Sequence, residues 1–285
     1  LRMIYAGKVA PVNTSLFTNY NDLASFTKDQ QWNSVNGQAY GIPHGWGANL
    51  LAWRTDKVTK APDSWSVVWE KNSPYKGKLT AYDSPTTIAD AAVYLKATKP
   101  ELKITDPYAL DKTQFAAAVA LAKQQQKNVA GYWSNYADAQ KAFENGTYTA
   151  GTAWQIIVNL AQGNGAKVES TLPKEGSTGW ADTWMIDAKS PHPNCAYKWM
   201  NWITTPKVQA QVASWFGEAP ANLKACDLTA ADGKNCTVFH AKDEAYFKDI
   251  AFWATPQATC LDGRRDVQCV PYSEWTTAWS SIRNS

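Results

Sequence analysis

The sequence has 285 residues, of which 45% are hydrophobic and 13% aromatic, and its 28 basic and 25 acidic side chains give a formal net charge of +3. A chain of this length can bury a sizeable core, as one large domain or two medium ones. The basic residues are scattered, so nothing marks a nucleic-acid surface, and no apolar run reaches the roughly 18 residues that a membrane span needs.

Predicted helices and strands alternate along most of the sequence. In the first third we expect the end of a helix at 1–7, a short helix at 22–31, a hairpin turn at 36–38, a glycine-rich loop at 44–47, a strand at 50–54, a short helix at 64–69 and a strand ending at 82. The middle predicts helices at 88–96, 111–126, 137–144 and 155–162, and strands at 129–134, 148–154 and 166–170. The last third predicts a strand at 184–186 and helices at 194–204, 206–216, 244–252 and 273–282. Such alternation indicates a mainly parallel sheet with helices on both faces.

The first residues indicate that the sequence opens inside an element. A globular chain seldom begins in the middle of a helix, so we expect earlier residues to be missing before Leu1. No signal peptide begins at Leu1, and an exported protein would therefore have lost its signal already.

Four of the five cysteines form two close pairs. Cys226 and Cys236, and Cys260 and Cys269, each bracket a short polar loop that a disulfide can close. Zinc binding by the four is the alternative, although there is no Cys-x-x-Cys knuckle. We expect two disulfides, an oxidising compartment and no metal site. Cys195 is left over and is predicted to be a buried thiol, with pairing to a residue outside this chain as the second interpretation.

The segment Trp180-Ala181-Asp182-Thr183-Trp184 places an acid between two indoles. It follows the turn-rich run 173–179, and we expect the chain to turn sharply there before the strand resumes. An ammonium group is attracted to an indole face by about 0.5–2 kcal/mol, and to a carboxylate by a charge-assisted hydrogen bond. The segment therefore suits a cation. The alternative is that both rings are core residues and that Asp182 makes a local turn contact.

Two further acids lie at predicted junctions. Asp83-Ser84-Pro85-Thr86-Thr87 joins the end of a strand to the start of a helix, a common ligand position in α/β proteins, although capping by Asp83 or Ser84 explains the segment equally well. Glu218 lies in the predicted loop 217–222, where a solvated acid is the usual case.

Several short segments stand in a recognisable order. They are YGIPHGWG at 40–47, YKGK at 75–78, AFENG at 142–146, PKEG at 173–176, WAD at 180–182 and EAPAN at 218–222. This order resembles the periplasmic spermidine/putrescine-binding proteins of ABC importers. The resemblance covers about Leu1 to Lys224, and PKEG followed by WAD is its most specific part.

The resemblance implies an α/β protein of the type II periplasmic-binding-protein fold, with two α/β lobes around a hinge that close on a ligand in a cleft. It implies lobe 1 at 1–47 and 182–226, and lobe 2 at 48–181 and 227–285. In that family a strand, a helix and a second strand precede the helix on which this sequence opens. The first lobe would lack these N-terminal elements here, together with an aromatic pair that contacts the ligand.

The resemblance also implies roles for particular residues. Asp83 and Asp182 match acids that bind the amino groups of the ligand, and Trp154 and Trp180 match rings that sandwich its methylene chain. The remaining predicted ligand-binding residues are Trp46, Ser84, Thr86, Ser134 and Glu218. The sequence departs from the family at Thr86, where a second acid is expected, and at Glu218, where a ring is expected. These departures indicate a repositioned amine, or a smaller or polyhydroxylated ligand that carries one.

The function implied is the solute-binding component of an ABC importer. We expect an exported monomer, periplasmic or extracellular and free or lipid-anchored, that captures a polyamine-like cation and delivers it to a membrane permease. We expect no enzymatic activity, no catalytic residue, no cofactor and no nucleic-acid partner. One alternative keeps the fold and changes the ligand to a sugar amine, an opine-like conjugate or an aminophosphonate. A more distant one is a glycoside hydrolase that uses Asp83 and Asp182.

Overall fold

The computed structural model describes residues 1–229 and 234–284, and the chain divides into two compact units. One unit comprises Leu1–Gly47 and Gly179–Ala254, and the other comprises Ala48–Thr178 and Thr255–Ser285. Residues 227–254, which the sequence assigns to lobe 2, group here with the first unit. The lobe boundaries inferred from sequence stay a prediction.

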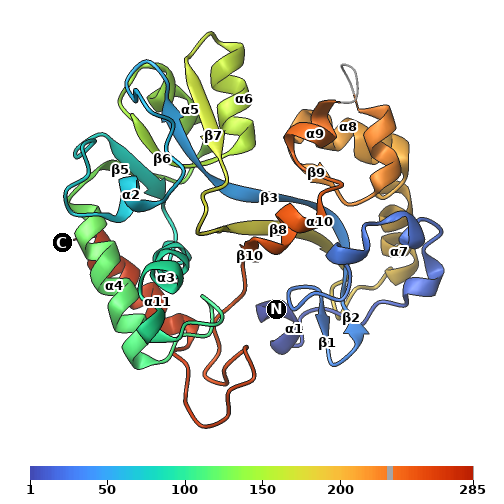
Figure 1. Cartoon of the computed structure of the whole chain (residues 1–285). Coiled ribbons are helices and arrows are strands. Elements are labelled where there is room, and N and C mark those ends of the chain that lie inside the picture. Colours follow the sequence, from blue (N-terminus) through green and yellow to red (C-terminus); the bar gives the residue numbers. More distant parts are fainter. Residues whose placement is uncertain (230–233, 285) are drawn as a thin grey trace. The chain divides into compact units, whose positions relative to one another are not determined.

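A sheet and two groups of helices form the second unit. The strands are the second half of β3 (Gly41–Arg54), β4 (Leu79–Tyr82), β5 (Val129–Trp133), β6 (Ala150–Trp154) and β7 (Val168–Thr171). The helices are α2 (Ser66–Trp69), α3 (Thr87–Thr98), α4 (Lys112–Gln126), α5 (Tyr136–Glu144), α6 (Gln155–Gly163) and α11 (Tyr272–Arg283), with a 3-10 turn at Pro100–Leu102. Helices α2, α3, α4 and α11 pack together, whereas α5 and α6 pack on each other and against β5, β6 and β7 (Figure 1).

The sheet of this unit is mixed. Strand β4 is parallel to both β5 and β6, as expected for strands joined through helices, but β3 is antiparallel to β6 and β7. The prediction of a mainly parallel sheet is therefore wrong for β3, which runs opposite to the other strands, including β7. Helix-linked alternation predicts the direction only of the strands that it connects, and β3 enters the unit without a preceding helix.

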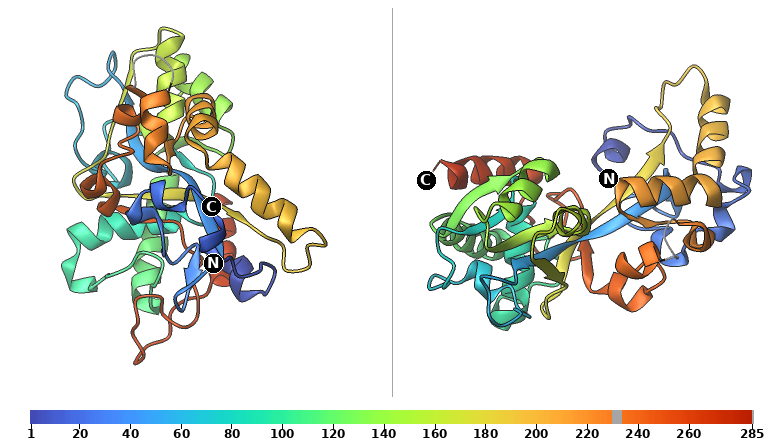
Figure 2. Two further views of the ribbon diagram at one scale, coloured as in Figure 1. Left: turned by 90° about the vertical axis from the view of Figure 1, so that its right-hand side faces the viewer. Right: turned by 90° about the horizontal axis from the view of Figure 1, so that it is seen from above.

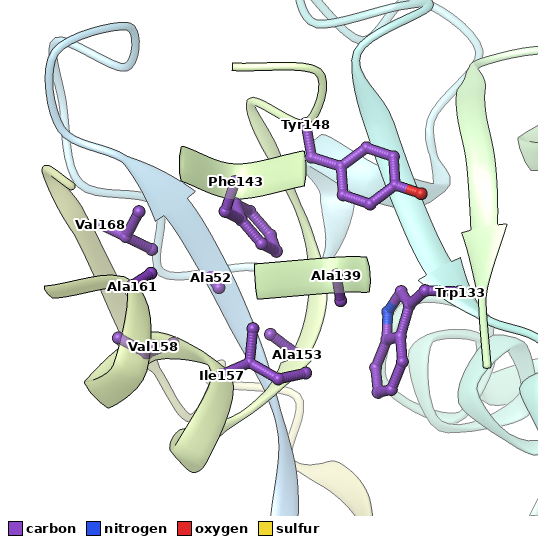
Figure 3. Close-up of a cluster of buried hydrophobic side chains, with 10 residues drawn as sticks. All are labelled: Ala52, Trp133, Ala139, Phe143, Tyr148, Ala153, Ile157, Val158, Ala161 and Val168. Atoms are coloured by element: carbon purple, nitrogen blue, oxygen red, sulfur yellow. The ribbon is translucent and has the colours of Figure 1, made fainter. Parts of the chain in front are cut away.

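The core on the α5 and α6 side follows from their sequence pattern. Ala139, Phe143, Ile157 and Ala161 recur at helical spacing and bury their side chains against the sheet (Figure 3). The other buried members of this cluster are Ala52, Trp133, Tyr148, Ala153, Val158 and Val168.

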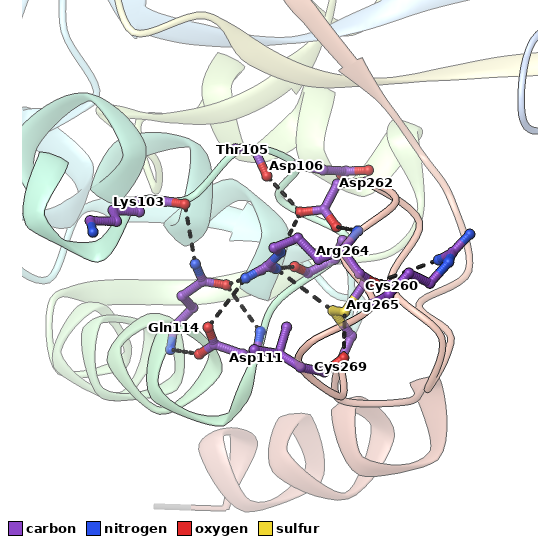
Figure 4. A network of polar contacts seen from close by, with 12 residues as sticks. Lys103, Thr105, Asp106, Asp111, Gln114, Cys260, Asp262, Arg264, Arg265 and Cys269 are labelled. Atoms are coloured by element: carbon purple, nitrogen blue, oxygen red, sulfur yellow. Dashed lines mark hydrogen bonds and ion pairs between the residues drawn. A yellow bond between two sulfur atoms is a disulfide. The ribbon is translucent and has the colours of Figure 1, made fainter.

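The segment 255–271 fastens α11 to the start of α4. Asp111 caps α4 in a capping box with Gln114. Arg264 contacts Oδ2 of Asp111 at 3.3 Å and donates from Nε to Asp262 Oδ2 at 2.8 Å, next to the disulfide between Cys260 and Cys269 (Figure 4).

The first unit contains shorter elements. They are α1 (Arg2–Tyr5), β1 (Ser34–Val35), β2 (Gln38–Ala39), the first half of β3, β8 (Ser177–Met185), α7 (Pro193–Ile203), α8 (Pro206–Phe216), β9 (Ala219–Pro220), α9 (Lys234–Val238), α10 (Glu244–Lys248) and β10 (Ile250–Phe252), with 3-10 turns at Thr14–Leu16, Tyr20–Asp22, Ser25–Thr27 and Leu223–Leu228. Strand β3, the long blue strand of Figures 1 and 2, lies beside β8 and β9 in this unit, and β10 lies beside β8.

Three predictions for this unit have different outcomes. The hairpin turn at 36–38 is confirmed, because Asn36 and Gly37 both take positive φ between β1 and β2. The helix predicted at 22–31 is wrong. The backbone there pairs instead with a distant segment, through a bridge from Leu23 to Asn222, and long-range pairing overrides a weak local helical preference. The helix predicted at 244–252 is α10, and its last part is strand β10.

The cysteine prediction is confirmed for both pairs. Cys226 and Cys236, and Cys260 and Cys269, form disulfides, which excludes zinc binding by these four. Cys195 is free and exposed on α7, so its prediction as a buried thiol is wrong. In the part of the chain that the structure describes, no helix has the length and apolar character to cross a bilayer.

Candidate functional site

Two glycines of β3 allow side chains from other elements to reach the strand backbone. A Cβ at Gly45 would lie 2.2 Å from Cδ of Glu218, and a Cβ at Gly47 would lie 2.7 Å from Cζ2 of Trp180. Only glycine fits at either position. The prediction of a glycine-rich loop at 44–47 is therefore wrong: the glycines serve close packing against a regular strand.

Strand β8 carries the acid and the two indoles on one face. The predicted turn is present at 173–176, where the N–H of Gly176 donates to the carbonyl of Pro173, but it does not extend to Trp180, because β8 runs without interruption from Ser177 to Met185. Side chains two residues apart point to the same face of a strand, so Trp180, Asp182 and Trp184 form a row. The arrangement of an acid flanked by indoles is thus produced by strand alternation.

Glu218 is a buried carboxyl at the end of α8. It follows Gly217, which ends the helix at a φ of +84°, and only 1% of the residue is exposed. Oε1 of Glu218 lies 3.3 Å from Nε2 of His44, while Oε2 has no hydrogen-bond partner among residues 1–229 and 234–284. An unpartnered, buried carboxylate oxygen is costly and is usually explained by a ligand, an ion or a bound proton.

Burial sets the charge of this pair. Burial, and to a lesser extent the charge of Asp182, raises the pKa of Glu218 to about 8, and burial lowers the pKa of His44 to about 4. Both groups are therefore mainly neutral at pH 7. Asp182 is accessible to solvent, but the protein atoms around its carboxyl desolvate it and raise its pKa as well. A cation bound close to these two carboxyls would favour their ionised forms and so offset the desolvation of each.

Gln209 of α8 fixes the orientation of the histidine. Its Nε2 lies 3.1 Å from Nδ1 of His44 and donates to the carbonyl of His44 at 2.8 Å, and its Oε1 accepts from the backbone N of Asn222. An amide N can only donate, so Nδ1 is the accepting nitrogen and Nε2–H faces Glu218. The sequence analysis missed His44 and Gln209 as site residues, because 165 positions separate them and no spacing connects them.

Aromatic rings surround this group of polar residues. The ring of Trp184 lies 5.4 Å from that of His44 and 5.7 Å from that of Trp199, and the ring of Trp180 lies 6.1 Å from that of Phe216. Trp46, a predicted ligand residue, is only 1% exposed and contacts core rings including Phe26 and Phe247. The burial and the ring contacts of Trp46 are those of a core residue.

Asp83, Ser84 and Thr86 are predicted ligand residues of the second unit, and they follow the end of β4. Trp279 of α11 donates from Nε1 to Oδ1 of Asp83 at 3.0 Å, and Arg283 forms an ion pair with Oδ2. Ser84 Oγ accepts from the backbone N of Thr86 at 3.2 Å and lies 2.9 Å from its hydroxyl, so these two side chains shape the first turn of α3. The sequence offered no signal for the contact of Arg283 with Asp83.

Trp154, at the end of β6, is held by a chain of hydrogen bonds. Its Nε1 donates to Oδ1 of Asn49 at 2.9 Å, and Nδ2 of Asn49 donates to Oγ1 of Thr178 at 2.6 Å. Thr178 in turn donates to Asp90, whose pKa burial raises to about 7. The Trp154 ring also packs 5.5 Å from that of Tyr82, the residue before Asp83.

The structure thus gathers the predicted residues within each unit. In the first unit Asp182, Trp180 and Glu218 lie along the neighbouring elements β3, β8 and α8. In the second unit Asp83, Ser84 and Thr86 share one turn, and Trp154 adjoins it through Tyr82. Ser134 is exposed just after β5. Among the described residues no group of three or more His, Cys, Asp or Glu side chains could hold a metal ion.

The comparisons with known proteins agree with this architecture. A model of the family described as "Bacterial extracellular solute-binding protein" matches residues 1–248, so the chain belongs to that family. Its members are binding proteins of the periplasm or the extracellular space, and this chain is assigned with them to the exported proteins.

Curated relatives share about a quarter of their aligned residues with the chain. The "Spermidine/putrescine-binding periplasmic protein" of Escherichia coli K12 is 27% identical over 235 residues, which cover 82% of this chain and 64% of that protein. The "Putrescine/agmatine-binding protein" of Pseudomonas aeruginosa PAO1 is 26% identical over 208 residues, with 67% and 54% covered. The chain therefore spans less than two thirds of the length of these relatives.

Solved structures confirm the predicted fold class. A putative spermidine/putrescine ABC transporter protein from Listeria monocytogenes has a TM-score of 0.79 at 16% identity, covering 99% of this chain and 80% of that one. The spermidine/putrescine substrate-binding protein PotD from Streptococcus pneumoniae has a TM-score of 0.75 at 17% identity, with the same coverage. The chain has the two-lobe α/β fold of periplasmic binding proteins, and its resemblance to the spermidine/putrescine type is confirmed.

Proposed function

We propose that this chain is the solute-binding component of an ABC importer that captures an organic ammonium ion and delivers it to a membrane permease. The observation that carries the proposal is the carboxyl of Glu218. It is buried, its Oε2 lacks a partner in the described part of the chain, and the acid Asp182 lies close enough for its charge to act on it.

An ammonium ligand answers the electrostatic needs of this group. Two neighbouring carboxyls without a bound cation repel each other when both are ionised, and burial makes that repulsion stronger. An ammonium group that donates to Oε2 of Glu218 would satisfy the oxygen and favour the ionised form of both acids. The neutral His44 adds no competing positive charge.

The aromatic side chains extend the argument to the ligand's alkyl part. Trp180 and Trp184 flank Asp182 on one face of β8, and an ammonium group over an indole gains about 0.5–2 kcal/mol. The same indole faces can also pack against methylene groups of the ligand.

Other amine ligands remain within the proposal. A sugar amine, an opine-like conjugate and an aminophosphonate each carry an ammonium group, and each would use Glu218 and Asp182 in the same way. The hydrolase alternative has no structural support, because Asp83 is already bound by Trp279 and Arg283 and is not available as a proton donor.

The test is a calorimetric titration of the chain at pH 8.5, where Glu218 is mainly ionised. The ligands are putrescine, spermidine, n-butylamine, choline, N-methylglucamine and 2-aminoethylphosphonate, with glucose as the uncharged comparison. Saturable binding of at least one ammonium ligand supports the proposal. Binding of glucose alone, or of no ammonium ligand, refutes it.

A further inference from the structure

Two backbone groups fix the side-chain amide of Gln209 within the first unit. Its Nε2 donates to the carbonyl of His44 at 2.8 Å, and its Oε1 accepts from the backbone N of Asn222 at 2.8 Å. A carbonyl only accepts and a backbone N–H only donates, so a flipped amide would face a like group on each side. Gln209 and Asn222 are both fully buried, so the amide of Gln209 is held in one orientation.

That orientation opposes a second proton on the ring of His44. Nε2 of Gln209 lies 3.1 Å from Nδ1 of His44. An imidazolium carries a proton on both ring nitrogens, and a proton on Nδ1 would point at the amide N–H, so that two donors would face each other. Gln209 therefore disfavours the charged ring, in addition to the burial that lowers the pKa of His44 to about 4.

The effect reaches Glu218 through the other ring nitrogen. Nε2–H of His44 faces Oε1 of Glu218, with 3.3 Å between the two heavy atoms. A neutral imidazole supplies a hydrogen to this oxygen but no positive charge. The proton of the neutral acid, or a cation that replaces it, then belongs at Oε2, which has no hydrogen-bond partner among residues 1–229 and 234–284.

The neighbours of this pair do not supply the missing charge. The titratable groups that act on Glu218 are His44 from β3 and Asp182 from β8, and the second is itself an acid. Within the described part of the chain, no Lys or Arg forms an ion pair with either acid. The ring of Trp184, 5.4 Å from that of His44, is uncharged. An ionised Glu218 therefore gains its compensating charge from a bound cation.

We infer that Gln209 is a positioning residue of the ammonium site: through His44 it withholds an internal cation from Glu218 and so reserves Oε2 for the charge of a ligand. The inference rests on the proposed function and deepens it. It assigns the requirement for a charged ligand to an uncharged amide on α8, all within the first unit.

The variant Gln209→Glu reverses this arrangement. It places a carboxylate oxygen beside Nδ1 of His44, where the oxygen accepts from Nδ1–H and favours the imidazolium. His44 then becomes a cationic partner of Glu218 and competes with the ligand. Gln211→Glu is the matched control, because Gln211 is exposed on the same helix and the substitution adds the same charge.

The first measurement needs no ligand. Ring ¹⁵N chemical shifts, measured by NMR, report the tautomer and the protonation of each histidine. The chain has three histidines, and His44→Gln identifies the signals of His44. In the unmodified chain and in Gln211→Glu we expect the neutral Nε2–H tautomer from pH 8.5 to about pH 5. In Gln209→Glu we expect the imidazolium at pH 7.

The second measurement is calorimetry at pH 7 with n-butylamine and putrescine. Gln209→Glu should bind each amine about 10-fold or more weakly than the unmodified chain, and Gln211→Glu should differ by less than about 3-fold. When His44 is also replaced, by His44→Gln, the loss caused by Gln209→Glu should shrink to less than about 3-fold, because no imidazole remains to be charged. A loss that came from local distortion would persist in the double variant.

Three outcomes overturn the inference and leave the proposed function intact. They are an imidazolium or an Nδ1–H tautomer of His44 in the unmodified chain at pH 7, equal amine affinities of Gln209→Glu and Gln211→Glu, and a loss from Gln209→Glu that is the same with and without His44. If circular dichroism shows that Gln209→Glu does not fold, the tautomer in the unmodified chain decides. If no ammonium ligand binds the folded, unmodified chain, the proposed function and this inference are both refuted.

Discussion

Nε2 of His44 lies 3.3 Å from Oε1 of Glu218, and burial keeps both groups in their neutral forms at pH 7. The pair joins strand β3 to the end of α8 within the first unit, and Gln209 holds the histidine from the other side. Substitutions at Glu218, or at a residue packed against it, should therefore change the free energy of unfolding and its dependence on pH.

Replacement of Glu218 by Gln should change the pH dependence of stability. Folding raises the pKa of Glu218 from about 4.5 to about 8, so the folded chain keeps a proton that the unfolded chain releases in this range. Stability from this group is present below pH 4.5 and is lost as the pH rises through 8. The free energy of unfolding of Glu218→Gln, relative to the unmodified chain, should thus increase from pH 5 to pH 8.

Urea unfolding at several pH values measures this difference. Glu244→Gln, which removes an exposed acid on α10 of the same unit, is the control and should give a difference that hardly varies with pH. A pH-independent difference for Glu218→Gln would contradict the assigned pKa.

Ligand affinity should rise with pH between about 6 and 9, because the protonated Glu218 must lose its proton to face a cation. Choline is the suitable ligand, since its own charge does not change with pH. Calorimetry at pH 7 in buffers with different ionisation enthalpies should show proton release on binding. The release should vanish in Glu218→Gln, and its absence in the unmodified chain would argue against ammonium binding at this carboxyl.

Asp182→Asn should weaken the binding of a cationic amine by on the order of 1.5–3 kcal/mol, the range of a hydrogen bond to a charged group. The row formed with Trp180 and Trp184 would remain, so the fold should persist. Titration calorimetry of this variant beside Glu244→Gln gives the comparison. Equal affinities in the two variants would remove Asp182 from the site.

Gly45→Ala should destabilise the chain by about 1–3 kcal/mol, because its Cβ would overlap the carboxyl of Glu218 and the buried side chain cannot move without repacking. Gly163→Ala is the matched control. A Cβ at Gly163, in α6, would meet no atom within 4 Å, so this change should be neutral or slightly stabilising. Melting temperatures check both, and equal values would show that the contact at Gly45 is not tight.

The cysteines predict a simple labelling pattern. Without reduction, one thiol should react with iodoacetamide in the folded chain, and peptide mapping should place it at the exposed Cys195. Reduction should raise the intact mass by two hydrogens for each of the two bridges. More than one reactive thiol before reduction would show that a bridge is not formed.

Local features of the fold were predictable where the deciding physics is short in range. The hairpin at 36–38, the disulfide loops and the helices α4 and α8 depend on residues that are close in sequence, such as Asp111 and Gln114 at the start of α4. The glycines at 44–47 were misassigned because the sequence shows their freedom but not the neighbours that require them. Glu218 and Trp180 become visible as those neighbours only in three dimensions.

The same limit applies to the candidate site. Asp182 between Trp180 and Trp184 was identified from residue types, since an acid between indoles is a local pattern, but the strand that aligns the three side chains was not. The partners that determine charge were not, because 200 positions separate Arg283 from Asp83 and 165 separate Gln209 from His44. Chemistry that depends on such distant contacts has no periodicity from which it could be read.

The discontinuous second unit has a consequence for the order of folding. Its sheet comes from residues between 48 and 178, and α11 completes its core, because Trp275 and Ile282 are fully buried. In the chain, the segment 179–254 of the first unit separates the sheet residues from α11. Long loops must close before these contacts form, which slows folding. The core of the second unit is therefore incomplete until Tyr272–Arg283 has been synthesised and has packed against the sheet-bearing segment.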